Sequence, residues 1–550
     1  MVYSERISGK EVSTVMELVR IFFDEFKDQE EKISNNHKDL IDNITWNDLS
    51  MDDVFNEINH TQSYIGEQVL YKRLHEPDAG RDWHSFEEQI TYLQQHPRQR
   101  ARIEKMLSKI GKREESYYLP QFLKHTELWK IQNGFLYHIL QMLLLGFGVI
   151  GMITKNDIFL AGLLAVAAVN LLVYLWVKNK YEIYLYSLSS VKQLTDFCKK
   201  MIFVKEWKSI FNSEEIEEAV HALGKVSKGI GNFESRKRVS WSGEPMALLQ
   251  DYLLGITLYD VSGFNHIMKA LDQKQDKLLV LYQFAGEIDM INAVAEYRER
   301  TVGECGEHIC VPEFGENTDE FGEAGGYREE GEGKLPGRAS IYMQGLRHPL
   351  LKHAVPNDFQ TAGCVLISGA NASGKSTFMK AAAINVILAQ TIHTCTAQTA
   401  KMPPLLVMTS MALRDDILTG ESYYIKEVRY LKRMLDEIEK GKPVLCVVDE
   451  MLKGTNTKER LAASEAILKY FAEKKCFVMA ATHDMELIEK MQEFYECWYF
   501  ESKVEEQDIR FDYVLHKGVG GRSNAVALLE LLGFPAEIVD RARGNLGNSR

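Results

Sequence analysis

The segment CVLISGANASGKSTFMK, residues 364–380, constrains the fold of this chain more than any other feature. Its apolar start is typical of a buried strand, and a glycine-rich loop with a lysine and a serine follows, at the spacing of a phosphate-binding loop before a helix. Such a loop points backbone N–H groups at phosphate oxygens, and the helix adds the positive end of its dipole. We expect Lys375 to reach the terminal phosphates of ATP and Ser376 to ligate Mg²⁺. The predicted nucleotide-binding residues of this segment are Gly369, Ala370, Asn371, Ala372, Ser373, Gly374, Lys375, Ser376 and Thr377.

Two later apolar runs end in residues that suit ATP hydrolysis. PVLCVVDE (443–450) ends in Asp449, which can hold Mg²⁺, and Glu450, which can orient or deprotonate the attacking water. CFVMAATHD (476–484) ends near His483, which we expect to sense the terminal phosphate. One strand end alone could be a solvated turn, but three beside one phosphate loop favour a catalytic site. The alternation of strands and helices predicts an α/β P-loop domain with a mostly parallel sheet between helices.

Two uncharged apolar segments lie in the middle of the chain, at residues 135–153 and 158–177. Their lengths match the hydrocarbon core of a bilayer, so they predict a two-helix transmembrane hairpin; a buried soluble hairpin is the alternative. His138, Gln141 and Asn170 are the polar exceptions, and we expect them to pack between helices rather than line a transport path, because one pair of helices encloses little space.

The charges around the hairpin predict its orientation. The connecting TKND carries one lysine and one aspartate, whereas many lysines and arginines precede and follow the pair. Because cationic flanks stay on the cytoplasmic side, we expect a multi-pass membrane protein whose N- and C-terminal parts both face the cytoplasm. The N-terminus is polar, and we expect no cleavable signal peptide.

The remaining segments predict helical regions and one linker. Glu, Lys, Leu and Gln predominate in residues 1–130 and 181–313, with apolar positions at helical spacing, which indicates an all-α core or lever region around the hairpin at 131–180. Residues 314–338 are rich in glycine and acid and predict a solvated linker, so that the ATPase domain would span residues 339–550.

Cysteines and net charge exclude some classes of function. The 8 cysteines lack paired spacing, which indicates reduced thiols. CGEHIC (305–310) brings two of them near His308, but its spacing fits no common zinc module, so metal binding there is the weaker alternative. The formal net charge of −13 argues against a uniformly basic nucleic-acid coat, although it permits a local basic face.

Several motifs together resemble the MutS family of ATPases, in the order in which that family has them. They are Arg347-His348-Pro349, GANASGKSTFMK, RDDILTGESYYIKEV, VVDEMLKGTNT, AATHDMEL and GVGGRSNAVALLELLGFPAEIVDRAR. The resemblance covers the chain from about Ile341 to the C-terminus. Weaker matches, DDVFNEINHTQSYIGEQVLYKRLHEP and EIDMINAVAEY, resemble the helical core and lever that precede this domain in the family.

The resemblance implies a homodimer with two composite ATP sites. Ser422 would reach the ATP of the opposite subunit, and the loop 454–457 would cross the dimer interface. Phe359 stands where an aromatic ring stacks on adenine, and Gln398 stands where the family couples the nucleotide site to the lever. Residues 522–543 resemble the C-terminal dimerisation element.

The sequence also departs from the family. It shows no mismatch-reading domain with a Phe-x-Glu wedge, no long clamp and no nuclease extension, and its clearest basic clusters flank the apolar hairpin, where they can serve topology or anionic lipid. The leading hypothesis is a membrane-anchored, dimeric, Mg-dependent ATPase that acts on DNA, as in mismatch repair, by resemblance. The alternative is a mechanochemical ATPase switch acting on lipid or a membrane protein without DNA. An ABC-type transporter fits poorly, because TGESYY does not match its signature loop.

Overall fold

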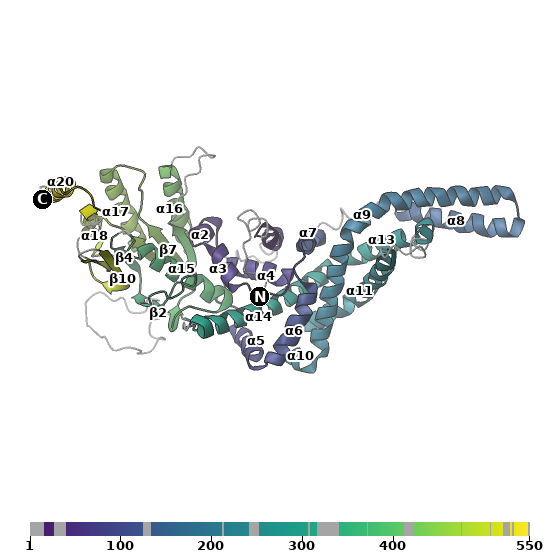
Figure 1. Ribbon diagram of the computed structural model, residues 1–550, viewed down its shortest axis with the longest axis horizontal. Coiled ribbons are helices and arrows are strands. Elements are labelled where there is room, and N and C mark those ends of the chain that lie inside the picture. The colour runs from purple at the N-terminus through teal and green to yellow at the C-terminus, as the bar shows by residue number, and fades with distance from the viewer. Residues whose placement is uncertain are drawn as a thin grey trace. The chain divides into compact units, whose positions relative to one another are not determined.

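The chain forms two compact units, which are described separately (Figure 1). The first takes in residues 1–36, 59–72 and 84–295, and the second takes in residues 37–58, 73–83 and 296–550. A computed structural model describes residues 16–26, 40–124, 134–211, 214–240, 252–305, 308–315, 340–370, 372–411, 423–474, 476–505, 508–520, 529–530 and 533–547. Most of the predicted linker, from residue 316 on, lies outside these ranges.

The first unit is built from helices. Residues 16–26 are helical, and the named elements that follow are α4 (Tyr64–His75), α5 (Trp83–Gln95), α6 (Pro97–Ile110), the short 3₁₀ helix η1 (Glu114–Tyr118), α7 (Leu119–Lys124), α8 (Gly134–Thr154), α9 (Asp157–Phe203), α10 (Lys205–Phe211), α11 (Glu214–Ser240), α13 (Tyr259–Asp272) and α14 (Gln275–Cys305). The helical character predicted for this region is confirmed.

A buried carboxylate on α14 fixes the start of α4. Asp289 is fully buried and accepts hydrogen bonds from the backbone N–H groups of Gln62, at 2.9 Å, and Ser63, at 2.8 Å. Gly66 is required one turn later, since a Cβ there would lie 2.3 Å from an Asp289 oxygen. The motifs HTQSYIGEQ and EIDMIN therefore contact each other, with the carboxylate supplying the helix cap.

Helices α8 and α9 pack along each other as an antiparallel pair (Figure 1). They contain the predicted segments 135–153 and 158–177, and α9 continues as one helix to Phe203. By length and composition, three stretches of the described helices could cross a membrane, at 134–154, 157–177 and 275–303. The apolar windows of the first two are only 6% and 11% buried, whereas that of the third is 78% buried. The described residues therefore leave the apolar surface of α8 and α9 largely uncovered.

The second unit contains two sheets. The larger has the order β10-β9-β4-β8-β7-β6, and all of its neighbouring pairs are parallel except β10 with β9. Its strands are β4 (Cys364–Ser368), β6 (Leu406–Ser410), β7 (Val444–Asp449), β8 (Phe477–Ala481), β9 (Glu496–Glu505) and β10 (Asp508–Lys517). The smaller sheet, of order β1-β5-β2-β3, is formed by β1 (Glu313–Phe314), β5 (Thr399–Met402), β2 (Ile341–Leu346) and β3 (Asn357–Thr361).

Helices accompany the larger sheet, and the central strands are buried on both faces. The described helices of this unit are α2 (Asn43–Asp48), α3 (Met51–Ile58), α15 (Lys375–Ile392), α16 (Tyr423–Glu439), α17 (Thr457–Glu473), α18 (Met485–Met491) and α20 (Ala536–Gly547). Every residue of β4, β6 and β8 is buried, which explains their continuous apolar runs. The α/β architecture with a mostly parallel sheet is the one that the sequence predicts.

The second unit begins earlier in the chain than residue 339, the predicted boundary. Helix α2 covers β6, the last strand of the larger sheet, and its residue Asp48 accepts hydrogen bonds from Thr409 Oγ1 at 2.8 Å and from the backbone N–H of Met411 at 2.9 Å. Arg433 adds a contact of 2.8 Å to Asp42. An uncovered edge strand exposes unpaired backbone groups, so α2 protects this edge.

Candidate functional site

The phosphate-binding loop has the backbone that its glycines predict. Gly369, Ala372 and Gly374 have φ angles of +147°, +65° and +107°, and α15 begins at Lys375. A Cβ on Gly369 would lie 3.1 Å from the carbonyl oxygen of Phe500, so the strand-to-loop turn has no room for a side chain. The loop therefore leaves β4 through a close turn and ends at the start of a long buried helix, which is an anion-binding arrangement.

Lys375 is held inside the loop. Its Nζ donates to the carbonyl oxygens of Gly369 at 2.7 Å and Ala370 at 2.8 Å, and the residue is only 5% exposed. Burial lowers the pKa of Lys375, while Glu450 and Asp449 oppose that shift. The ammonium group is thus placed where the phosphates of a nucleotide would lie against the loop.

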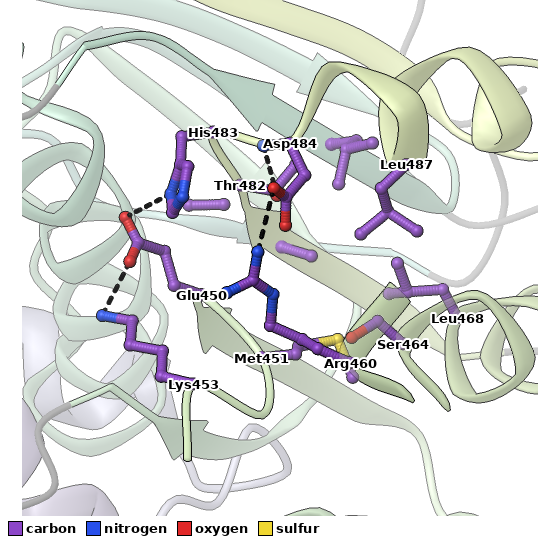
Figure 2. Close-up of a pocket in the computed structure, with 13 residues that line it drawn as sticks. Glu450, Met451, Lys453, Arg460, Ser464, Leu468, Thr482, His483, Asp484 and Leu487 are labelled. Carbon is purple, nitrogen blue, oxygen red and sulfur yellow. Dashed lines mark hydrogen bonds and ion pairs between the residues drawn. The ribbon is translucent and has the colours of Figure 1, made fainter. Parts of the chain in front are cut away.

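The ends of β7 and β8 bring the acidic pair and the histidine to this loop. Ser376 Oγ donates to Asp449 Oδ2, which joins the start of α15 to the end of β7. Glu450 Oε1 lies 3.2 Å from His483 Nδ1, and its other oxygen lies 2.8 Å from Lys453 Nζ (Figure 2). Lys375, Ser376, Asp449, Glu450 and His483 therefore gather at the carboxyl edge of the sheet, which is where open α/β sheets bind ligands.

The environment of Glu450 keeps it ionised. Burial acts to raise the pKa of this carboxyl, but Lys453 and His483 outweigh burial and hold the pKa below its usual value. Glu450 has a φ of +56°, and its backbone N–H donates to the carbonyl of Ala481 at 3.0 Å, so β8 supports an unfavourable backbone conformation. An ionised carboxylate in this position can orient a water molecule or accept its proton.

A second buried carboxylate holds the loop that carries Lys453. Glu427, on α16, is 4% exposed and accepts from the backbone N–H groups of Lys453 at 3.0 Å and Gly454 at 3.2 Å. Burial raises the pKa of Glu427, although these donors oppose it. A Cβ on Gly454 would lie 2.9 Å from the Tyr424 side chain, so the loop packs directly on the first turn of α16. Sequence reasoning missed Glu427; only its place in the motif ESYYIKE pointed to it.

A cavity of about 350 Å³ adjoins the phosphate loop. Gly374, Thr377 and Phe378 form one side of it, and His348 and Tyr513 contribute from other segments. Burial lowers the pKa of His348 to about 4, and its Nδ1 accepts from the N–H of Leu350 at 3.3 Å, which fits a neutral ring. The cavity is mainly apolar with a few polar groups, as expected of a ligand site.

Two residues that were predicted to contact the nucleotide, Phe359 and Gln398, do not line this cavity. Phe359 is 2% exposed and packs against the rings of Phe378 and Trp498, at centroid distances of 5.4 and 5.9 Å. Among the described residues it does not line the cavity, so its ring belongs to the core and is not placed to stack on a base there. Gln398 is exposed, directly precedes β5 and bonds through its N–H to the carbonyl of Gln344 at 2.8 Å; it does not line the cavity either.

Some of the predicted residues lie outside the described part of the chain. They are Asn371, Ser422 and, in the segment 522–543, residues 522–528 and 531–532. The loop 454–457 is described, and Asn456 in it caps α17 by accepting from the N–H of Glu459 at 3.0 Å.

The CGEHIC segment forms no three-ligand cluster among the described side chains. Cys310 pairs through its backbone with Cys395, at 3.0 and 2.9 Å, and the side chain of Cys305 lies outside the description. Within the described ranges, the one grouping with metal-ligand geometry is Glu501, Asp512 and His516, which the β9 and β10 hairpin carries at its surface.

The residues of the loop fit a magnesium nucleotide. The Ser373 hydroxyl is fully buried and has no hydrogen-bond partner among the described residues, which leaves a donor inside the loop. Ser376 and Asp449 offer a hydroxyl and a carboxylate oxygen, the ligand types that Mg²⁺ prefers.

Comparison with known proteins identifies relatives of this domain. Residues 365–548 match the family described as MutS domain V. The chain is 32% identical over 221 residues to the DNA mismatch repair protein MutS of Natronomonas pharaonis, which covers 38% of this chain and 26% of that protein. It is 31% identical over 205 residues to the protein of the same name from Thermus thermophilus, covering 36% and 25%. For the MutS of Ruminiclostridium cellulolyticum the identity is 26% over 320 residues, covering 54% and 33%.

The chain therefore spans about a quarter to a third of the length of these curated relatives. The family match, at residues 365–548, lies within the second unit, in which the phosphate loop, the acidic pair and the histidine come together.

Proposed function

The C-terminal domain of this chain belongs to the MutS family, and from this premise we propose that the protein is a membrane-anchored ATPase whose subunits pair to hydrolyse ATP. The observation that carries the proposal is the convergence of Lys375, Ser376, Asp449, Glu450 and His483 on one phosphate loop.

The residues divide the work of hydrolysis. When a nucleotide binds, the Lys375 ammonium exchanges its hydrogen bonds to two loop carbonyls for hydrogen bonds to phosphate oxygens. The exchange costs little free energy, because hydrogen bonds between a charged donor and a charged acceptor are the stronger ones. Ser376 and Asp449 would hold Mg²⁺, which would supply charge neutralisation on the phosphates. Glu450, ionised, orients the attacking water and accepts its proton, and His483 positions Glu450 and senses the terminal phosphate.

The cavity beside the loop is the proposed site of the nucleotide base. It adjoins Gly374 and Thr377, where the loop ends, and its neutral His348 and exposed Tyr513 offer ring surfaces in place of Phe359. Asn357 fixes Tyr513 by donating to its carbonyl at 3.1 Å. Aromatic faces stack on bases without demanding a hydrogen-bond pattern.

A second subunit would complete each site. In the sequence, Ser422 directly precedes α16, and Glu427 lies on that helix. Glu427 holds the loop that contains Lys453 and Gly454. The helix that follows Ser422 is therefore bonded to the loop whose lysine pairs with Glu450. This arrangement fits a dimer in which nucleotide binding at one site is sensed at the other.

Membrane anchoring rests on the uncovered apolar surface of α8 and α9. Exposed side chains such as Met152, at 84%, and Ile153, at 77%, would face water without a bilayer, and patches of this extent mark an interaction surface. The cationic flanks support an orientation with both ends of the hairpin in the cytoplasm.

ATP turnover by the purified full chain in detergent or liposomes tests the proposal that the protein hydrolyses ATP. We expect Lys375→Ala to lose productive ATP binding and Glu450→Gln to bind ATP without turning it over, while Glu439→Gln, an exposed change on α16, keeps the parental rate. Parental turnover in the Glu450→Gln variant contradicts the assignment.

Labelling of intact cells tests the membrane half. A cysteine in the loop 154–157 should react with an impermeant reagent from outside. Reaction only after permeabilisation contradicts the orientation, and recovery of the protein in the soluble fraction contradicts the anchoring.

The target of ATP turnover is proposed to be DNA, since the matched relatives are named DNA mismatch repair proteins. The net charge of −13 favours a second candidate, a membrane switch without DNA. A DNA clamp should bind duplex DNA with an affinity that falls steeply with added salt, because each phosphate contact releases a counterion. Absence of binding at low salt supports the switch.

A further inference from the structure

Two of the three polar side chains that interrupt the apolar hairpin bond to one turn of the segment before α13. Gln141 Nε2 on α8 donates to the carbonyl of Thr257 at 3.0 Å, and Asn170 Nδ2 on α9 donates to the carbonyl of Ile256 at 2.7 Å. Residues 252–256 are helical and end in this turn. The turn is therefore docked on both helices of the hairpin.

The docking point lies within the exposed apolar band of the hairpin. From Gln141 or Asn170 to the tip, either helix rises about 20 Å, which is short of the hydrocarbon core of about 30 Å. Exposed apolar side chains continue below the docking point to Phe135, which is 76% exposed, and Trp176, which is 65% exposed, and they add about 9 Å to the span. A bilayer that covers the whole band therefore extends past the docked turn.

The turn has no free backbone acceptor, as an element at that depth requires. Besides the two carbonyls bonded to the hairpin, the remaining carbonyls of residues 253–258 accept from the segment itself. The donors are Thr257 N to Leu253 O at 3.1 Å, Thr257 Oγ1 to Leu254 O at 3.0 Å, Leu258 N to Gly255 O at 2.9 Å and Ser262 N to Leu258 O at 3.0 Å. Irregular backbone is tolerated in hydrocarbon only when its polar groups are satisfied in this way.

The side chains of the segment suit lipid. Residues 252–259 read YLLGITLY and carry no charge. Tyr252, Leu253 and Tyr259 are 48%, 55% and 56% exposed, and tyrosines are enriched at the membrane interface. Gly255 faces the hairpin, where a Cβ would lie 2.5 Å from the ring of Tyr174, so the contact with the hairpin is tight.

We propose that residues 252–259 form a third membrane-embedded element, a re-entrant turn in the cytoplasmic leaflet, docked on Gln141 and Asn170 and covered by lipid at Tyr252, Leu253 and Tyr259. The proposal rests on the membrane anchoring of the hairpin. The occupant is lipid rather than a second copy of the chain, because the exposed face is continuous with the apolar band of α8 and α9, which lipid already surrounds.

Spin labels on single introduced cysteines in the full-length protein in liposomes test the inference. Leu253→Cys probes the turn, Val149→Cys probes the hairpin, and Lys228→Cys, exposed on α11, reports water. The parent chain, treated with the same label, supplies the background from its own cysteines. At residue 253 we expect a collision rate with dissolved oxygen close to that at 149, and a collision rate with an aqueous nickel chelate roughly tenfold below that at 228, since charged solutes are excluded from hydrocarbon.

The outcomes separate the two proposals. Lipid exposure at 149 with water exposure at 253 overturns the re-entrant turn and leaves the anchor standing, whereas water exposure at 149 overturns both. Shielding of 253 from both reagents indicates a protein partner and also overturns the inference. A second label at Tyr252→Cys should agree with residue 253, and adding Asn170→Leu should raise nickel access at both positions while leaving residue 149 unchanged.

Discussion

Replacing Glu427 should slow ATP hydrolysis without weakening ATP binding. Its carboxylate accepts two backbone N–H groups, from Lys453 at 3.0 Å and Gly454 at 3.2 Å, and thereby holds the loop whose lysine pairs with Glu450. Hydrogen bonds to a charged acceptor contribute about 1.5 to 3 kcal/mol each. Because burial disfavours this charge, as the raised pKa of Glu427 shows, we take about 3 kcal/mol for the pair.

A loss of that size makes the ordered loop about a hundredfold less populated relative to displaced arrangements. We expect Glu427→Ala to lower kcat for ATP by one to two orders of magnitude and to change KM by less than about threefold, since Lys375 and the phosphate loop are untouched. Glu427→Gln retains one carbonyl acceptor, so its kcat should lie between that of Glu427→Ala and that of the parent.

Steady-state turnover of the full-length protein over a range of ATP concentrations measures both constants. Asp436→Ala serves as the control, because it removes an exposed carboxylate from the same helix, whose ion pair among the described residues is with the surface lysine Lys432. Unchanged kcat in Glu427→Ala, or a loss that appears entirely in KM, would refute the idea that this carboxylate positions the hydrolytic loop.

Three further perturbations test other parts of the structure. Asp48→Ala removes the acceptor for Thr409 and Met411, so amide exchange at Met411 should accelerate by roughly tenfold or more, whereas the exposed Asp53→Ala should leave it unchanged. Because the pKa of His348 falls to about 4 on folding, the unfolded chain binds a proton more readily than the folded chain as the pH is lowered. The ATPase domain should therefore lose about 2 kcal/mol of its free energy of unfolding between pH 7 and pH 5. In chemical unfolding, His348→Gln should flatten this pH dependence, and an unaltered dependence contradicts the burial of a neutral ring. Gly66→Ala places a methyl group against Asp289 and should destabilise the helical unit by several kcal/mol in thermal unfolding, whereas Gly224→Ala, in open space on α11, should not.

The grouping of Lys375, Ser376, Asp449, Glu450 and His483 could be predicted, because these residues belong to short contiguous motifs. A loop that begins at a strand and ends at a helix fixes Lys375 and Ser376 locally, and parallel strands end at one edge, so Asp449 and His483 had to lie near it. The tertiary partners could not be predicted in this way. Glu427 approaches Lys453 through packing of α16 on a loop, and Asp48 reaches β6 from the opposite end of the chain, and neither contact follows from local pattern.

Phe359 shows how local resemblance can misplace a residue. It lies on β3, where side chains alternate between faces, and Asn357, Phe359 and Thr361 are the buried ones. The ring therefore enters the core between Phe378 and Trp498, while the cavity is lined from the turn that precedes the strand, by His353, Ala354 and Val355. The position of a residue within a motif predicts which part of the fold it lies in. On a strand, however, side chains alternate between the two faces, and this alternation decides which side the ring faces.

For the polar residues of the hairpin, the residue type correctly indicated packing against protein, but the sequence did not indicate which segment they contact. Gln141 and Asn170 were expected to pack between helices, and they do pack on protein, but their acceptors are carbonyls of a turn nearly ninety residues or more further along the chain. An amide in an apolar helix costs free energy unless it is bonded, and a turn with unpaired carbonyls has the same difficulty in hydrocarbon. In the proposed placement the two bonds lower both costs, while Asn170 Oδ1 stays buried without a partner among the described residues. In the proposed re-entrant placement, the uncharged stretch 252–259 would tie the helices of the first unit to the hairpin through these two bonds.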